Sequence, residues 1–454
     1  MAGSESTIGA LLDETGGSIK TGPFGTKLKA SEYTATGVPV ISVGEVGFGR
    51  LRVHHDTPRV DDTVSSRMPE YLLKAGDIVF GRKGAVERSA QVQPDEDGYF
   101  LGSDGIRIRL NVEECDPKFI SYQLQTTAHR SWMIQHAAGT TMPSLNEGII
   151  RRIPIVLKPL AEQKAIAAVL GALDDKIELN RRMNATLEAM ARALFQSWFV
   201  DFDPVRAKMD GREPVGLDPG TASLFPEHLE DSLLGKKPID WEITTLDHAL
   251  AVLETGGRPK GGVAGITSGV PSIGAESIVS IGMFDFGKTK FVPVEFYKGM
   301  KKGHIESHDV LLYKDGGRPG VFEPHVSMFG DGFPFEKCSI NEHVYRLRSN
   351  ERLSQEYLYF WLNSEFALAE MRIKGTGVAI PGLNSTAVRS LGVLVPPSSI
   401  IETFTNEVAP LVTQILSNAK QSRSLAVLRD TLLPKILSGE LQVPIARQLI
   451  EAQP

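Results

Sequence analysis

Short apolar or alternating runs, bounded by Gly, Pro and Asp, mark two long parts of this 454-residue chain. Such runs are typical of β-strands joined by turns. In the first part they lie at residues 37–43, 76–80, 106–110 and 153–157, and in the second at 308–313, 343–348 and 391–395. Helical patterns near 117–135 and 353–373 lie among them. Each part is therefore predicted to be a mixed α/β domain.

Each part is followed by a long stretch in which apolar residues recur three or four positions apart. This spacing predicts amphipathic helices. Gly171-Ala172 and Ala409-Pro410 fall at the same point of the two stretches, so both helices are expected to kink or restart there. Residues 201–240 are rich in Pro, Gly and Asp and lack a sustained period, which predicts an extended linker.

The second half of the chain repeats the first. Four matching pairs of segments carry the repeat: 37–39 with 269–271, 75–80 with 307–312, 116–126 with 353–364, and 139–160 with 375–397. The helical stretches superpose at the same offset, so we expect one arrangement built twice. The predicted order is first domain, first helix, linker, second domain, second helix and tail, at residues 1–158, 159–200, 201–240, 241–397, 398–440 and 441–454.

Two asparagines lie in the apolar seam of the first helix. Leu173 and Ile177 begin the seam, and Asn180 and Asn184 take its next two positions, although buried amides are costly without partners. A helix this long needs a partner for its apolar face, and the chain contains one matching helix. We therefore expect the two helices to form a coiled coil.

If a pseudo-twofold axis relates the halves, the helices run antiparallel, and Asn180 faces Ser422 while Asn184 faces Asn418. The predicted core of the pair is Ile177, Asn180, Asn184, Leu187, Ile415, Asn418, Ser422 and Leu425. Such a polar layer fixes register at some cost in stability. A parallel pair would instead place Asn180 beside Asn418, and a third interpretation leaves the asparagines exposed on a helix that packs elsewhere. The predicted fold is thus α/β (mixed α+β), with two repeated domains separated by an antiparallel two-helix coiled coil.

Composition narrows the class of protein. The chain is 41% hydrophobic, and no apolar run approaches the roughly 18–20 residues that span a bilayer. The N-terminus lacks the pattern of a signal peptide, and Cys115 and Cys338 have no nearby cysteine partner, so reduced cysteines and a cytoplasmic location are expected. Residues 201–240 carry nine acidic against five basic side chains, most of the net charge of −6. The two domains are close to neutral, which permits DNA binding without requiring it.

Motifs of catalysis are missing from the sequence. It contains no G-x-x-x-x-G-K-[ST] phosphate loop, no Asn/Asp-Pro-Pro-aromatic motif of amino-methyltransferases, and no Cys or His set that completes a metal site around His54-His55. We therefore expect no catalytic residues and no metal ligands. A binding protein is the simplest interpretation.

The ends of the two domains carry a family resemblance. The first reads IPIVLKPLAEQKAIAAVLGALDDKIELNRRMNATLEAMARALFQSWFVDFDPV, and the second reads LGVLVPPSSIIETFTNEVAPLVTQILSNAKQSRSLAVLRDTLLPKILSGEL. Together they closely resemble the specificity subunit of type I DNA restriction-modification enzymes. The chain departs from that family in its slightly acidic charge and in Pro410 within the second helix.

The resemblance implies a function and partners. Each domain would be a target recognition domain that reads one half of a bipartite, gapped site in double-stranded DNA, and the coiled coil would space the halves. Two adenine-methylating methyltransferase (modification) subunits would dock on the coiled coil and domains. Restriction/translocase subunits would join them to make an ATP-dependent endonuclease, with no membrane involved. S-adenosylmethionine, ATP and Mg would bind those partners, and this chain would hold no cofactor.

Three pairs of loops offer polar side chains for DNA contact. The first pair follows matched strands at 81–88 and 313–322, and its candidates are Arg82, Lys83, Arg88, Lys314 and Arg318. The second precedes the last strand of each domain, with Thr140, Thr141, Ser144, Asn146, Lys374, Thr376 and Asn384. The third lies early in each domain, with Lys27, Lys29, Arg258 and Lys260 as phosphate contacts. Each loop could instead be a plain surface turn, and the asparagines could simply cap the turn that follows.

Two other classes of function stay open. A scaffold that binds only proteins would use the same strut and domains, and an enzyme could hide a site between domain and helix. Partner docking is expected on free helix faces and on the aromatic segment 195–202, although Trp198 could equally be the last layer of the helix core.

Overall fold

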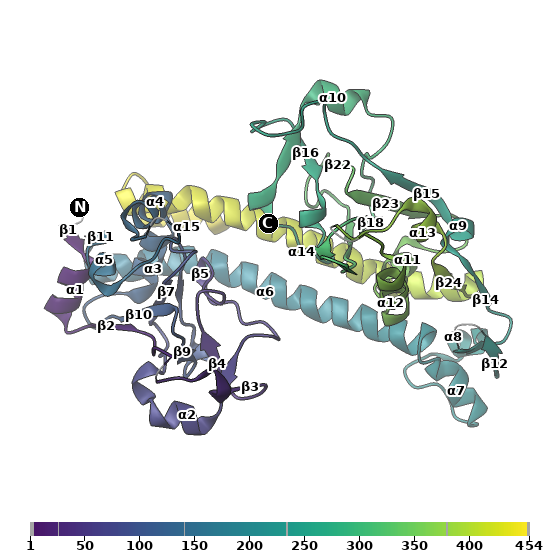
Figure 1. Cartoon of the computed structure of the whole chain (residues 1–454), viewed down its shortest axis with the longest axis horizontal. Coiled ribbons are helices and arrows are strands. Elements are labelled where there is room, and N and C mark those ends of the chain that lie inside the picture. The colour runs from purple at the N-terminus through teal and green to yellow at the C-terminus, as the bar shows by residue number, and fades with distance from the viewer. Residues whose placement is uncertain (1–3, 26, 140, 233–234, 378–379, 452–454) are drawn as a thin grey trace. The chain divides into compact units, whose positions relative to one another are not determined.

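The computed structural model describes residues 4–25, 27–139, 141–232, 235–377 and 380–451. The chain forms two compact units (Figure 1). Unit 1 comprises residues 1–175 and 425–454, and unit 2 comprises residues 176–424. The division falls inside both long helices, so each helix contributes one segment to each unit.

Unit 1 contains the first repeated domain. Its strands are β1 Ser4–Thr7, β2 Ser18–Thr21, β3 Tyr33–Thr34, β4 Val38–Ile41, β5 Gly49–Arg50, β6 Arg59–Val60, β7 Ile78–Gly81, β8 Ser89–Gln91, β9 Phe100–Leu101, β10 Gly105–Arg109 and β11 Pro154–Leu157. Its helices are α1 Ile8–Thr15, α2 Asp62–Arg67, α3 Pro117–Gln125, α4 Thr127–His136, α5 Glu147–Arg151, α15 Val443–Glu451 and the adjoining segments of α6 and α14.

Unit 2 contains the second repeated domain. Its strands are β12 Leu229–Ser232, β13 Gly235–Pro238, β14 Glu242–Thr245, β15 Leu250–Thr255, β16 Val270–Ile273, β17 Lys290–Val292, β18 Asp309–Tyr313, β19 Gly317–Arg318, β20 Val321–Phe322, β21 Val326–Phe329, β22 Ser339–Ile340, β23 Val344–Ser349 and β24 Gly392–Val395. Its helices are α7 Asp203–Met209, α8 Pro219–Leu224, α9 Leu246–Ala249, α10 Val294–Gly299, α11 Gln355–Leu362, α12 Glu365–Lys374, α13 Ser385–Arg389 and the remaining segments of α6 and α14.

The two domains share one sheet topology. The main sheet runs β2-β10-β7-β8-β5 in the first domain and β15-β23-β18-β21 in the second, so that four strands correspond. A smaller sheet joins β4 to antiparallel β6 and parallel β9, and its counterpart joins β16 to antiparallel β17 and parallel β22. The pairs β1–β11 and β14–β24 also correspond. The repeat and the mixed α/β class predicted from the sequence are thus confirmed.

The shared Gly-Val-Pro segment shows why part of the repeat is visible in sequence. Gly37 has φ 114° and Gly269 has φ 137°, values that favour glycine. A Cβ atom at Gly37 would lie 2.4 Å from the Val60 carbonyl oxygen, and one at Gly269 would lie 2.3 Å from that of Val292. The same close approach of two backbones therefore requires glycine in both domains.

The long helices are continuous. Helix α6 spans Leu160–Phe199 and α14 spans Ser398–Ser438, without the restart expected at Gly171 and Pro410. Pro410 is tolerated because its ring removes only one backbone donor, while its neighbours continue the hydrogen-bonded helix. No restart therefore divides either helix.

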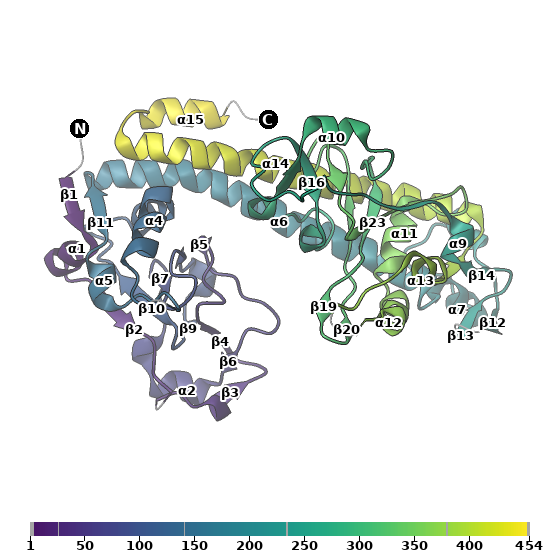
Figure 2. The same cartoon turned by 45° about the horizontal axis from the view of Figure 1, so that its top comes forward.

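Within unit 2 the two helices run antiparallel and lie side by side (Figures 1 and 2). Asn180 donates through Nδ2 to Ser422 Oγ at 3.2 Å, and Asn418 donates through Nδ2 to Asn184 Oδ1 at 2.9 Å. Asn184 in turn donates to the Ile415 carbonyl at 3.1 Å. Partner numbers fall on α14 as they rise on α6, which excludes the parallel alternative.

The predicted polar layer is therefore present. Asn180 is 1% exposed and Asn184 is half-buried, so the alternative of solvent-facing asparagines is wrong, and their partner Asn418 is 5% exposed. Ile415 and Leu425 are buried, and Ile177 and Leu187 are half-buried. Within unit 1 the same helices meet through an ion pair between Arg429 and Asp174, 2.7 Å apart.

The segment 201–240 is not an extended linker. It forms α7, α8 and the antiparallel pair β12–β13, and it buries Phe202 and Phe225. The Phe225 ring lies 5.1 Å from the Trp198 ring, and the Phe202 ring lies 5.9 Å from that of Trp241. These widely spaced aromatic side chains carry no period but bury together against α6, so the expectation of an extended segment was wrong. Trp198, 2% exposed, belongs to this core.

Both cysteines are free and buried. Burial raises the pKa of the Cys115 thiol and of the Cys338 thiol to about 12 in each case. The thiols are therefore protonated and unreactive at neutral pH.

Candidate nucleic-acid interface

Two loops of the first domain are held together by their backbones. The Gly84 amide donates to the Pro143 carbonyl at 2.9 Å, and the Leu145 amide donates to the Arg82 carbonyl at 2.8 Å. The loop after β7 and the loop before α5 thus form one surface. The sequence singled out both loops but gave no reason for them to touch.

The second domain has the same two backbone hydrogen bonds between the equivalent loops, and we call this shared arrangement the frame. The Gly316 amide donates to the Pro381 carbonyl at 2.8 Å, and the Leu383 amide donates to the Lys314 carbonyl at 2.8 Å. Arg82 and Lys314 therefore occupy equivalent positions. Each also donates its own backbone amide across the main sheet, Arg82 to the Asp104 carbonyl and Lys314 to the His343 carbonyl.

Arg82 is fixed by its surroundings. Its Nη1 donates to the Ser103 carbonyl at 3.1 Å, and its guanidinium lies 5.1 Å from the centroid of the Phe24 ring. Lys83 Nζ lies 3.5 Å from an Asp104 carboxylate oxygen while 48% of its side chain stays exposed. A cation held in one geometry loses little entropy when it binds an anion.

Two exposed phenylalanines, which sequence reasoning missed, accompany these cations. Phe24 is 57% exposed and Phe48 is 39% exposed. Arg130 lies 4.1 Å and Arg88 lies 5.8 Å from the Phe48 ring centroid. Both rings are next to glycine in the sequence, as PFG and GFG, and this pattern could have indicated them. Exposed rings with cations over them can stack on bases.

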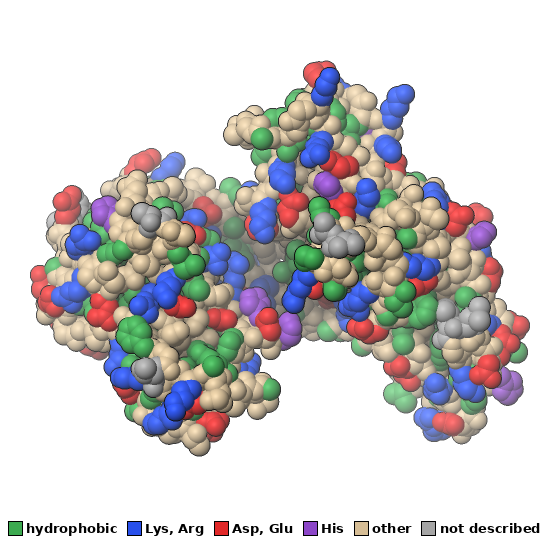
Figure 3. Space-filling view, viewed as in Figure 1, with side chains coloured by type: hydrophobic (Ala, Val, Ile, Leu, Met, Phe, Trp, Pro, Cys, Tyr) green, Lys and Arg blue, Asp and Glu red, His purple; other side chains and the backbone are tan. Residues whose placement is uncertain are grey.

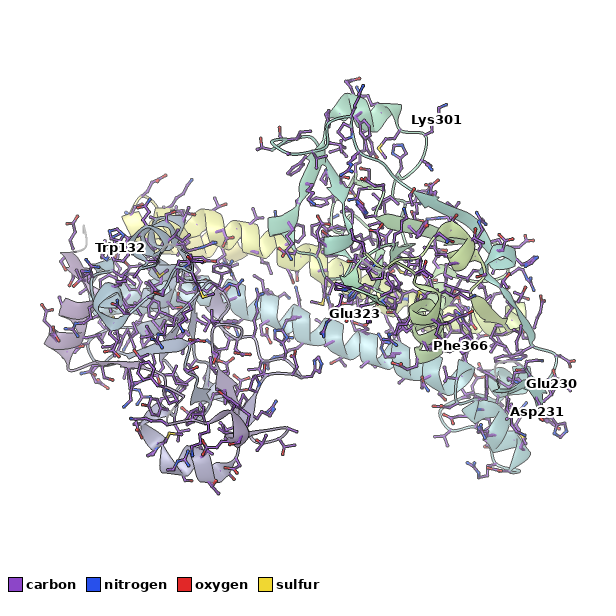
Figure 4. The ribbon with its side chains drawn as sticks, in the orientation of Figure 1. Trp132, Glu230, Asp231, Lys301, Glu323 and Phe366 are labelled. Atoms are coloured by element: carbon purple, nitrogen blue, oxygen red, sulfur yellow. The ribbon has the colours of Figure 1, made fainter. Side chains whose placement is uncertain are left out.

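On the same backbone frame, the second domain carries different side chains from the first. Lys314 Nζ donates to the Glu342 carbonyl at 3.3 Å, and Asp315 accepts from His343 Nδ1 at 2.7 Å in the place that Lys83 takes in the first domain. Arg318, on the β19–β20 hairpin, has a side chain that is 85% exposed. Its nearest acid is Glu323, 3.9 Å away and labelled in Figure 4.

The asparagines of the second loop pair are helix caps. Asn146 Oδ1 accepts from the Ile149 amide at 2.9 Å, and Asn384 Oδ1 accepts from the Ala387 amide at 2.8 Å. The capping alternative therefore accounts for both oxygens, although both residues are exposed.

Of the other candidates in this loop pair, some side chains already form hydrogen bonds or ion pairs within the domain, and others are exposed. Ser144 Oγ donates to the Ala138 carbonyl at 3.1 Å. Lys374 Nζ donates to the Ser390 carbonyl at 2.7 Å and pairs with Glu370 at 2.8 Å. Thr141 and Thr376 are exposed, and Thr140 lies outside the described residues.

The early loops present four cations. Lys27 Nζ lies 3.4 Å from the Tyr71 hydroxyl, and Arg258 pairs with Glu342 at 2.7 Å. Lys29 and Lys260 are exposed. Figure 3 shows Lys and Arg side chains mixed with Asp and Glu on the visible face of each unit, rather than a wholly basic face. Contacts to phosphate would therefore be local to these loops.

A buried acid stands below the frame in each domain. Asp77, directly before β7, and Asp309, the first residue of β18, are 1% and 0% exposed. Asp77 pairs with Arg109 at 2.6 Å, and Asp309 pairs with Arg348 at 2.9 Å and with Arg346. The hydrogen bond to Asp77 raises the pKa of Arg109 above its usual range. These pairs tie the strand that leads into the cationic loop to its neighbour, which stabilises the loop base.

In the described part of the chain, no group of three or more His, Cys, Asp or Glu could hold a metal ion. None of the described helices is both long enough and apolar enough to cross a membrane.

Comparison with known proteins identifies the relatives of this chain. The family model of the type I restriction modification DNA specificity domain matches residues 23–189. The MjaIX specificity subunit of a type I restriction enzyme from Methanocaldococcus jannaschii is 24% identical over 341 residues, 75% of this chain and 73% of that protein. The HindI specificity subunit from Haemophilus influenzae is 25% identical over 414 residues, 81% and 87% of the two chains.

A solved structure shares the fold. The S subunit of a type I restriction-modification system from M. genitalium covers 95% of each chain at a TM-score of 0.52 and 16% identity. These relatives match 75% and 81% of this chain, more than the region that the family model covers. This chain is thus similar to type I restriction-modification specificity subunits over most of its length.

Proposed function

We propose that this chain recognises double-stranded DNA through the paired loops of its two repeated domains, as the specificity subunit of a type I restriction-modification complex. The observation that supports this most is the shared frame, which presents Arg82 in one domain and Lys314 in the other. Because the frame is the same but the side chains differ, each domain would read its own short sequence. The target is then a bipartite site with a gap.

The proposed domains follow the repeat. Residues 1–158 and 241–397 are the two target recognition domains, and 159–200 and 398–440 are the spacer helices. Two methyltransferase subunits would dock on helix faces that the antiparallel pair leaves free, and restriction/translocase subunits would join them. Methylation with S-adenosylmethionine, and ATP- and Mg-dependent cleavage, would belong to those partners.

The proposed contacts fall into two kinds. Arg82, Lys83, Arg88, Lys314 and Arg318 would enter a groove, because arginine and lysine are the common readers of guanine edges. Lys27, Lys29, Arg258 and Lys260 would hold phosphates, together with the open polar groups Thr141 and Thr376. Lys374, Ser144, Asn146 and Asn384 would act by holding their loops, since each already bonds within its own domain.

Mapping of methylated bases tests the function. Genomic DNA would be compared between cells with the intact gene and cells in which it is deleted. We expect one gapped, two-part methylation motif to disappear on deletion. An unchanged methylome would contradict DNA recognition and favour the scaffold alternative.

Single arginine variants test the division between domains. Arg82→Ala is expected to weaken binding of the assembled complex to the first half-site by about 1–3 kcal/mol if the contact is bidentate to guanine. Arg318→Ala should do the same at the second half-site only. Gel shifts on duplexes with one half-site scrambled would separate the two effects, and Arg212→Ala, an exposed arginine in the segment between the domains, is the control. Equal loss at both half-sites would contradict this assignment.

A further inference from the structure

Each domain carries an exposed aliphatic side chain at the tip of the loop before its capped helix. Met142 is 59% exposed in the first domain, and Ile380 is 71% exposed in the second. Proline follows in both, as Pro143 and Pro381. Single exposed apolar residues are ordinary on a protein surface. The same feature at the same position of two diverged domains is not explained by chance exposure.

The backbone shows that the two positions are equivalent. A bridge joins Ala138 to Ser144 in one loop, and a bridge joins Thr376 to Gly382 in the other. Each loop also turns at a glycine of positive φ, 95° at Gly139 and 122° at Gly377.

The close approach inside each turn is equivalent as well. A Cβ at Gly139 would lie 2.6 Å from the Met142 carbonyl oxygen, and one at Gly377 would lie 2.5 Å from that of Ile380. In both loops the exposed side chain thus stands three positions after a glycine that its own carbonyl oxygen approaches closely.

The tips lie directly beside the cationic loops. The residue after each tip anchors the loop, because Pro143 accepts from the Gly84 amide and Pro381 accepts from the Gly316 amide. Gly84 is two positions from Arg82, and Gly316 is two positions from Lys314. An apolar side chain in a polar and cationic surround is the combination that proteins use when they insert a side chain between DNA bases.

Two exposed aliphatic residues on helices of the same domains lack this pattern. Ile134 on α4 is 54% exposed, but the repeat places Arg372 at its counterpart. Ile373 on α12 is 82% exposed, but its counterpart is Gln135. Both lie on helices of the same domains, so they supply matched controls.

We propose that Met142 and Ile380 are wedge side chains that enter the base stack of duplex DNA, one in each half-site. This inference rests on the proposed function and deepens it. An enzyme that modifies a base within a duplex must first take that base out of the stack. A wedge beside the target fills the space that the extruded base leaves, which lowers the cost of extrusion for the partner methyltransferase. Methionine and isoleucine are both among the side chains that serve as such wedges.

A fluorescent base analogue tests the proposal in the assembled complex. 2-Aminopurine would replace the methylated adenine in one half-site at a time, and its fluorescence increase on binding would report unstacking. Met142→Ala is expected to lower the increase in the first half-site by about tenfold while leaving the second unchanged. Ile380→Ala should give the reverse, and Met142→Leu should retain the signal.

The controls separate this proposal from the function on which it rests. Ile134→Ala and Ile373→Ala should leave both signals unchanged, and Met142→Ala should still bind the site in a gel shift. A Met142→Ala signal equal to that of Ile134→Ala would overturn the wedge. The wedge would also be overturned if the wild-type complex lost the same fluorescence increase on DNA in which uracil replaces every thymine. Contact between Met142 and a thymine methyl group would then explain the effect of Met142→Ala. If the wild-type complex binds no specific DNA, the proposed function itself fails.

Discussion

His308 joins three parts of the second domain through one side chain. It lies at the start of β18 in a left-handed conformation, φ 62°, and its side chain is 20% exposed. Nδ1 lies 2.9 Å from a Glu356 oxygen on α11, and Nε2 lies 3.1 Å from an Asp331 oxygen in the loop after β21. The hydrogen bond to Glu356 is the main cause that raises the pKa of His308 to about 8, against the opposing effect of burial.

The pH dependence of stability follows from that shift. Because the pKa of His308 rises from 6.5 to about 8 on folding, the charged ring stabilises the fold fully below about pH 6.5. This contribution, at most about 2 kcal/mol, is lost as the pH rises through about 8. We expect His308→Gln to flatten the difference in free energy of unfolding between about pH 6 and about pH 9, measured by urea denaturation. A variant that keeps the wild-type pH profile would show that the ring carries no such charge.

For individual residues, the sequence predicted which positions are candidates better than it predicted what each side chain contacts. Arg82 and Lys314 were found because both follow a matched strand. The exposed rings of Phe24 and Phe48 were missed, because a phenylalanine in a loop ordinarily indicates burial. The buried acids Asp77 and Asp309 look like turn residues in the sequence, since only the folded sheet brings arginines of the next strand to them.

The helix pair shows what periodicity can and cannot predict. The polar layer was predicted because a repeat combined with a twofold axis determines which residues face each other. The continuity of α14 through Pro410 was not, since a proline only biases a helix toward breaking. The fold of 201–240 was missed for a related reason, because Phe225 and Trp241 bury by tertiary contact without any local period.

The layer itself can be tested by a double-mutant cycle. Asn418→Ala leaves Asn184 Oδ1 and Gln414 Nε2 without their bonds of 2.9 and 2.7 Å, which should cost about 1–3 kcal/mol in free energy of unfolding. Because Asn184 and Asn418 share one bond, the double variant should cost less than the two single variants together, by about 0.5–3 kcal/mol.

Thr186 supplies the control for this cycle. Its hydroxyl is exposed and bonds only to the Arg182 carbonyl of its own helix, 3.2 Å away. The cycle of Thr186→Ala with Asn418→Ala should therefore be additive within about 0.5 kcal/mol. Additivity in the Asn184 cycle as well would mean that the layer contributes no pairwise energy, and register would have to come from the apolar residues alone.

The whole molecule is a duplicated object in which each repeat contributes a domain and a helix. Because the same strand order appears twice, the topology of one domain gives the topology of the other. The repeat does not fix the side chains on which DNA sequence specificity would depend. Lys83 is replaced by Asp315, and Phe24 stands in a loop where the second domain has Arg258, so the frame is shared while the side chains of the proposed DNA-binding surface are not.

Both long helices pass from one compact unit to the other between residues 175 and 176 and between 424 and 425. Seven extra residues with helical propensity inserted at both points would add two turns, about 10 Å, while keeping each apolar face aligned. We expect the assembled complex to methylate a motif whose gap is longer by about three base pairs, at 3.4 Å per pair. Insertion into α6 alone would shift Asp174 along α14 while the asparagine layer stays in place. The ion pair with Arg429 would then be out of register, so specific methylation should be lost. Base-resolved methylation mapping reads both outcomes, and an unchanged gap in the double insertion would show that the helices do not set the spacing.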